Sequence, residues 1–166
     1  MQSKRTPASS VAMGGLLAAL AVTVMSMGTL IPIAVYVCPI FCALLLKVVW
    51  KLCGTRIAWA WYGAVALLCL LLAPDKEAAA VFAFLGYYPI VKPMLDKRKL
   101  PWLWKGLMFN GSILCMYWLL IHLFGLEQVT AEFEGLGIIM TSVLLILGNI
   151  TFFLLDRLLG MRLKRK

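Results

Sequence analysis

The sequence is poor in the residues from which most catalytic and metal sites are built. Its 166 residues include one histidine and seven acidic residues. The Cys-x-x-Cys, His-Glu-x-x-His, Gly-x-Ser-x-Gly and phosphate-loop motifs are all missing, and these are typical of zinc sites, hydrolases and nucleotide-binding proteins. The five cysteines have no histidine or carboxylate beside them, so we interpret them as small packing residues. We therefore expect no metal, no cofactor and no enzymatic activity.

Long hydrophilic stretches are also missing. Hydrophobic residues make up 63% of the chain, whereas a soluble domain averages about 45–50%. A membrane-spanning helix needs about 20 apolar residues, and six segments of that order leave no room for a soluble catalytic or ATP-binding domain. The sequence predicts one all-α, six-span transmembrane domain over residues 1–166. The predicted spans are 11–30, 31–53, 57–73, 78–95, 104–124 and 136–158.

Positive charge is nearly missing from one side of the predicted membrane. If the N-terminus is cytoplasmic, Lys76 is the only basic residue outside. Because basic residues stay on the cytoplasmic side during insertion, both termini are predicted to be cytoplasmic. The net charge of +9 then reflects topology and contact with lipid head groups rather than nucleic acid. The inner residues are Lys4, Arg5, Lys47, Lys51, Arg56, Lys92, Lys97, Arg98, Lys99, Lys105, Arg157, Arg162, Lys164, Arg165 and Lys166.

The middle of each predicted span lacks acidic residues. Proton-coupled carriers usually keep a titrating carboxylate at that depth. The sequence also shows no inverted repeat with matching broken helices, which self-sufficient secondary transporters often have. Both absences argue against a stand-alone proton antiporter or a self-sufficient secondary transporter. Because the six spans also leave no room for an ATP-binding domain, any active transport is expected to draw its energy from an ion gradient or from a partner protein.

The first predicted span is rich in small residues. Gly14 with Ala18, and Gly15 with Ala19, form two overlapping small-xxx-small pairs. Such pairs let two helix backbones approach closely, because little side chain separates them. They predict either packing inside the protein's own bundle or a docking face for another membrane subunit.

The fourth predicted span carries two features of interest. Asp75 is suited to cap its N-terminus, with Glu77 in the first turn, where carboxylates interact favourably with the helix dipole. The alternative is that Glu77 forms a charged lip on a ligand site. Gly86 and Pro89 predict a break around Tyr88 near mid-membrane, which is either a packing kink or the marker of a binding site.

Each polar or aromatic residue singled out in the last two predicted spans has two interpretations. Trp118 and His122 share a helix face near the outer end. They are either interfacial residues, or a ring that stacks on a ligand and an imidazole that hydrogen-bonds it. Asn149 lies deep in the last span, where it either clamps two helices together or contacts a ligand. Asp156 is expected to have a surface ion partner. The acidic stretch 126–135 is expected to be an outer loop that forms a short surface helix or a lid.

The longest inner connection, residues 92–105, combines charge with aromatic residues. It contains Asp96-Lys97-Arg98-Lys99 followed by Pro101-Trp102-Leu103-Trp104. This composition is typical of a segment at the membrane interface. The segment is predicted either to anchor the fold or to be held by a cytoplasmic partner.

The run Gly14-Gly15-Leu16-Leu17-Ala18-Ala19-Leu20-Ala21, with six short spans and no energising domain, resembles the substrate-binding (S) component of energy-coupling-factor transporters. Members of that family typically carry an Ala-x-x-x-Ala pair, whereas glycine stands first in both pairs here. The resemblance implies a bacterial cytoplasmic-membrane subunit that captures a vitamin-like small molecule. It also implies docking through the two small-residue pairs on a transmembrane coupling subunit, which works with two ATPases.

The resemblance further implies a pocket in the later spans and outer loops. By position its residues would be Glu77, Tyr88, Trp118, His122 and Thr141. Two other functions remain open at this point. The chain could be a non-catalytic accessory or scaffold subunit of another membrane complex, or an intramembrane enzyme acting on lipid-linked substrates through His122, Asp156 and the inner basic loop.

Overall fold

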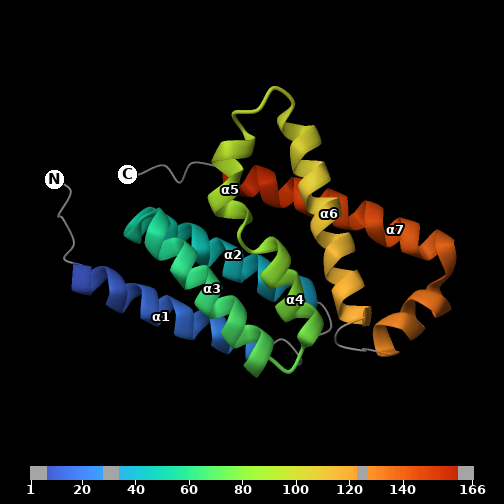
Figure 1. The fold of residues 1–166 in the computed structure, drawn as a ribbon, viewed down its shortest axis with the longest axis horizontal. Coiled ribbons are helices and arrows are strands. Elements are labelled where there is room, and N and C mark those ends of the chain that lie inside the picture. The colour runs from blue at the N-terminus through green and yellow to red at the C-terminus, as the bar shows by residue number, and fades with distance from the viewer. Residues whose placement is uncertain (1–6, 28–33, 123–126, 161–166) are drawn as a thin grey trace. The chain divides into compact units, whose positions relative to one another are not determined.

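The structure is a computed structural model that describes residues 7–27, 34–122 and 127–160. The described residues form helices and no strand, which confirms the predicted all-α class. The chain divides into two compact units, Met1–Pro93 and Met94–Lys166. The helices are α1 (Pro7–Ser26), α2 (Ala34–Cys53), α3 (Thr55–Leu72), α4 (Lys76–Leu85), α5 (Tyr88–Leu95), α6 (Pro101–His122) and α7 (Glu127–Gly160) (Figure 1).

Within the described residues, three helical segments are long and apolar enough to cross a membrane. They are Tyr36–Cys53, Thr55–Leu72 and Lys76–Leu95, and they correspond to the second, third and fourth predicted spans. The apolar part of α1, Val11–Ser26, is shorter. These segments support an integral membrane protein, since a span needs about 20 apolar residues.

The first unit is built on α1, α2, α3 and α4. Helix α1 packs against α2 and α3, and both α2 and α3 pack against α4 (Figure 1). Small and medium-sized side chains fill the core between them, which allows the helices to approach closely. Three of the five cysteines, all with free thiols, are buried there as the sequence predicted. The largest fully buried side chains of the core are Met25, Cys42, Leu46, Val49, Val65, Cys69 and Phe82.

The tight connection between α3 and α4 has the predicted cap. The Asp75 carboxylate accepts a hydrogen bond from the backbone N–H of Ala78 at 3.0 Å. The Lys76 ammonium donates to the carbonyl oxygens of Leu70 at 2.9 Å and Leu71 at 3.3 Å. These bonds satisfy an orphan donor of α4 and orphan acceptors of α3, so the chain can reverse without leaving those groups unpaired.

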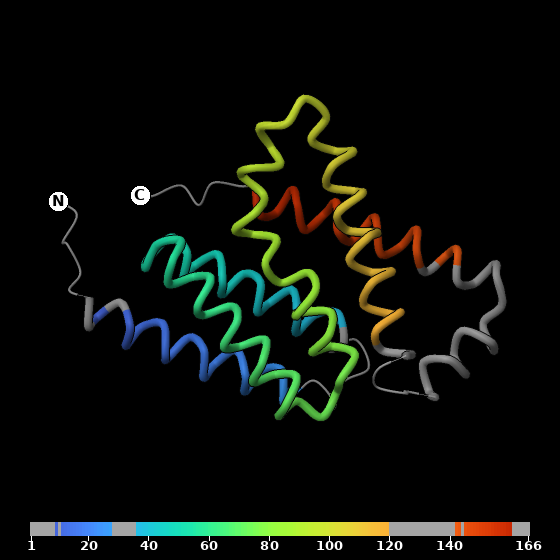
Figure 2. The backbone as a smooth tube through the Cα atoms, viewed as in Figure 1, coloured from blue at the N-terminus to red at the C-terminus, as the bar shows by residue number. Residues whose placement is uncertain are grey.

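The predicted break in the fourth span is also present. Helix α4 ends at Leu85 and α5 begins at Tyr88, and the backbone bends between them (Figure 2). A Cβ atom on Gly86 would lie 2.6 Å from Cδ2 of the Phe82 ring, so this turn requires glycine. Pro89 has no N–H to continue the helix. By contrast, α2 continues through Pro39 as one helix.

The second unit consists mainly of α6 packed against α7. The Phe109 and Phe152 rings stack across this pair, with centroids 4.5 Å apart and an angle of 20° between their planes. Helix α7 begins at Glu127, so residues 127–135, which we expected in an outer loop, are helical and continuous with the last predicted span.

Candidate functional site

The two small-residue pairs of α1 face different surroundings. Gly14 is buried, and its carbonyl oxygen accepts a 2.9 Å hydrogen bond from the indole N–H of Trp61 on α3. A Cβ atom on Gly14 would lie 3.9 Å from Cδ1 of that indole. Ala18 is partly buried and packs against the core. This pair therefore packs inside the bundle of the first unit.

Gly15 and Ala19 lie on the open side of α1. Both are exposed, and a Cβ atom on Gly15 would meet nothing within 4 Å. Ala12 and Thr23 are exposed at helical spacing along the same face. We call Ala12, Gly15, Ala19 and Thr23 the small-residue face. The backbone of α1 is accessible along this face, which is the geometry that close helix–helix packing in membranes uses.

This division follows from helix geometry. At 3.6 residues per turn, adjacent residues point about 100° apart. The Gly14/Ala18 and Gly15/Ala19 pairs are offset by one residue, so one pair can enter the bundle while the other faces outward. The sequence contained this signal, but it did not indicate which of the two pairs would be inside.

Two of the five predicted pocket residues lie in the first unit, at opposite ends of α4. Glu77 is in the first turn and is partly buried. Tyr88 follows the end of α4 and is 1% exposed. At about 1.5 Å per residue, roughly 15 Å of helix separates them. The structure therefore does not bring Glu77 and Tyr88 together.

The other three predicted pocket residues belong to the second unit. Trp118 on α6 is 62% exposed. His122 is the last residue of α6 and Thr141 lies within α7, but their side chains fall outside the described part of the structure. The predicted pocket of five residues stays a prediction.

A cluster of aromatic residues on α3, on α4 and directly after it supports the break after α4. The Tyr62 hydroxyl on α3 donates a hydrogen bond to the carbonyl oxygen of Ala83, in the last turn of α4. Carbonyl groups in that turn have no partner within the helix. The Tyr62 ring centroid lies 5.7 Å from that of Phe82, 5.9 Å from Trp59 and 6.0 Å from Tyr87. Tyr62 thus satisfies a backbone acceptor that lipid could not satisfy.

Two asparagines join α6 to α7 in the second unit. The amides of Asn110 and Asn149 exchange hydrogen bonds, each 3.1 Å long. Each amide nitrogen also donates at 2.9 Å to the carbonyl four residues earlier in its own helix. The structure therefore favours the helix–helix clamp over the ligand contact for Asn149, because its oxygen and its amide nitrogen are already engaged.

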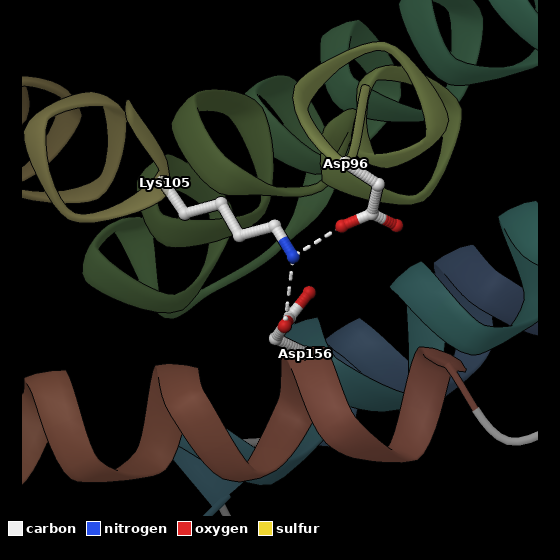
Figure 3. A network of polar contacts seen from close by, with 3 residues as sticks. All are labelled: Asp96, Lys105 and Asp156. Carbon is white, nitrogen blue, oxygen red and sulfur yellow. Dashed lines mark hydrogen bonds and ion pairs between the residues drawn. The ribbon is translucent and has the colours of Figure 1, made fainter. Parts of the chain in front are cut away.

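An ion network also joins the second unit. The Lys105 ammonium lies between the carboxylates of Asp96, just after α5, and Asp156 on α7 (Figure 3). Its distance to Oδ2 of Asp156 is 3.0 Å. The side chains of Lys105 and Asp156 are 12% and 17% exposed, whereas Asp96 is 43% exposed. The ion partner predicted for Asp156 is therefore Lys105, which the sequence could not identify across 51 positions. The pair is largely buried, so the predicted surface position of this contact was wrong.

No cluster of three or more metal-ligating side chains occurs among the residues that the structure describes. No family model, curated protein or solved structure matches the chain.

Proposed function

We propose that this chain is the membrane-embedded substrate-capture subunit of an uptake transporter for a vitamin-like small molecule. In this proposal a transmembrane coupling subunit and two ATPases energise transport. The chain has six spans, with both termini in the cytoplasm, and resides in a bacterial cytoplasmic membrane.

The small-residue face of α1 carries this proposal. Gly14 and Ala18 hold α1 in the first unit, while Gly15 and Ala19 leave its backbone accessible on an exposed side of the helix. Lipid tails are as apolar as the helix, so helix association in a membrane depends on close packing, which small residues permit. A subunit without its own energy source needs such a contact with a coupling partner.

The six-span topology is supported by the helices and by the charges. Each of the six predicted apolar segments coincides largely with α1, α2, α3, the α4–α5 pair, α6 or α7. Three of these segments meet the length and hydropathy of a span within the described residues. The orientation is supported by the single basic residue on the predicted outer side, Lys76.

The proposal is tested by affinity purification of the full chain from native membranes in mild detergent, followed by mass spectrometry. We expect a transmembrane coupling subunit and two ATPases with the wild-type protein, and their loss with Gly15→Trp. Gly63→Trp is the matched control, because Gly63 on α3 is also exposed with nothing within 4 Å of a built Cβ. Purification of the chain alone, or equal recovery with Gly15→Trp, would refute the docking role.

A scaffold or accessory subunit of another membrane complex is the second candidate. It is favoured by polar side chains that serve packing, namely the Asn110–Asn149 pair and the Lys105 network. Trp118→Ala separates the two functions, because truncating an indole that is 62% exposed changes fold stability little. For a capture subunit, we expect one compound from a panel of water-soluble vitamins to raise the melting temperature of the wild-type protein, and to raise that of Trp118→Ala less. For a scaffold, no compound stabilises the wild-type protein.

A further inference from the structure

The segment that joins α5 to α6 carries exposed basic and apolar side chains side by side. We call residues 94–107 the connecting segment; it includes the end of α5, the loop after it and the first two turns of α6. Lys97, Arg98 and Lys99 are consecutive and all exposed. The segment follows directly on a candidate membrane span, which ends at Leu95. The basic triplet therefore emerges at a membrane surface, whichever side of the membrane that is.

The apolar side chains of the connecting segment are unusually open. Met94 and Trp102 are each 70% exposed, Leu107 is 66% exposed and Leu103 is 50% exposed. Trp102 and Leu103 stand in the first turn of α6, which begins at Pro101. Tryptophan beside aliphatic residues at the end of a span is typical of side chains that enter the boundary between head groups and acyl chains.

The basic residues of the connecting segment divide into two sets. Lys105 is 12% exposed and is paired with Asp96 and Asp156, so its charge is already balanced inside the second unit. The guanidinium of Arg98 lies 5.3 Å from the centroid of the Trp104 ring, a cation–π contact that holds it beside the aromatic residues. Lys97, Arg98 and Lys99 therefore form the local positive surface.

We infer that the connecting segment binds anionic phospholipid. In this inference Lys97, Arg98 and Lys99 contact the phosphate head groups, while Trp102, Leu103 and Leu107 enter the adjoining apolar layer. A lipid fits better than an acidic protein because the charge and the open apolar side chains both occur where a span leaves the membrane. The inference does not depend on the proposed transport function.

The expected strength follows from the number of charges. Each basic residue near an anionic membrane surface strengthens association about fivefold, and three together reach about 100-fold at low salt. Salt screens such contacts, because the Debye length falls from about 10 Å at 0.1 M to about 3 Å at 1 M. Preference for anionic over zwitterionic lipid should therefore fall as the salt concentration rises.

The test compares lipid binding by the purified full chain in detergent. Native mass spectrometry measures bound phosphatidylglycerol and phosphatidylcholine for the wild-type protein, for Lys97→Gln/Arg98→Gln/Lys99→Gln and for the matched control Lys51→Gln/Arg56→Gln. The control removes two exposed basic residues at the junction of α2 and α3. We expect a 10- to 100-fold preference of the wild type for phosphatidylglycerol, lost in the triple variant and largely retained in the control.

Trp102→Ala tests the apolar part of the proposed lipid contact. Trp102→Ala should weaken binding of both lipids several-fold without changing the salt dependence. A wild-type protein with no lipid preference, or equal losses in the triple variant and the control, would overturn the inference. If millimolar inorganic phosphate displaced bound phosphatidylglycerol as effectively as added lipid does, the basic triplet would instead be a binding site for a free anion. Salt-sensitive binding of an acidic protein, without lipid preference, would assign it to a protein partner.

Discussion

The indole N–H of Trp61 donates a 2.9 Å hydrogen bond to the carbonyl oxygen of Gly14, across the contact between α3 and α1. Gly14 lies well inside α1, so its carbonyl oxygen accepts this bond in addition to the backbone hydrogen bond within the helix. Trp61 is 5% exposed, and its indole would otherwise be buried without a partner. The bond therefore requires α1 to approach α3 closely. A Cβ atom on Gly14 would already lie in van der Waals contact with the indole, 3.9 Å from its Cδ1, so a larger side chain would meet the ring.

The first prediction concerns the two adjacent glycines of α1. Gly14→Leu should destabilise the protein by about 1–3 kcal/mol, because the added atoms meet the Trp61 ring and overpack the contact. Gly15→Leu should change stability by less than about 1 kcal/mol, since a Cβ atom there meets nothing within 4 Å. Thermal unfolding in one detergent measures both. Equal losses would contradict the assignment of Gly14 to the buried face and of Gly15 to the exposed face.

The second prediction concerns the support of the broken helix. Tyr62→Phe keeps the ring contacts but removes the hydrogen bond to the Ala83 carbonyl. An unsatisfied buried acceptor costs about 1–3 kcal/mol. We expect lower thermal stability, with faster amide hydrogen exchange around the break at residues 85–88. Tyr36→Phe is the control, because Tyr36 is 53% exposed. An unchanged melting temperature for Tyr62→Phe would show that the Ala83 carbonyl does not need the hydroxyl.

The helical architecture could be predicted from the sequence because it depends on local patterns. Long apolar stretches predicted most helix ends to within about four residues, and Gly86 with Pro89 predicted the break after α4. The predicted start of α7 was wrong, because it begins at Glu127 rather than at residue 136. The Asp75 cap was predictable for the same reason, since its partner Ala78 lies three residues away. These features need no knowledge of which helices become neighbours.

The partners of the polar residues could not be predicted, because they depend on packing between distant segments. Lys105 meets Asp156 across 51 positions, and Trp61 reaches Gly14 across 47. The sequence showed that Asn149 needs a partner in an apolar environment, but any polar residue of the bundle met that need. The predicted pocket stays a prediction for the same reason. Its residues were chosen by position along the predicted spans, and the structure places Glu77 in the first turn of α4 and Tyr88 at the start of α5.

The third prediction concerns the amide pair of the second unit. A double-mutant cycle with Asn110→Ala and Asn149→Ala should give a coupling free energy of about 0.6–1.7 kcal/mol, which is the range for polar pairs between membrane helices. Thr151→Ala is the control, because its hydroxyl bonds only the Leu147 carbonyl of its own helix and is exposed. Pairing Asn110→Ala with Thr151→Ala should therefore give additive changes. A coupling energy near zero for the two asparagines would contradict the clamp.

The last prediction concerns the ion network in Figure 3. Lys105→Met removes the cation that Asp96 and Asp156 share. The variant should be destabilised by about 1–3 kcal/mol, since hydrogen bonds to charged groups contribute about that much. Most of this loss should come from Asp156, because Asp96 is 43% exposed and water solvates it. Adding Asp156→Asn to Lys105→Met should therefore restore part of the stability, whereas adding Asp96→Asn should restore less. Lys97→Met, at an exposed position in the same segment, is the control for loss of one positive charge. If Lys97→Met and Lys105→Met lowered the melting temperature equally, net charge rather than the network would explain the effect.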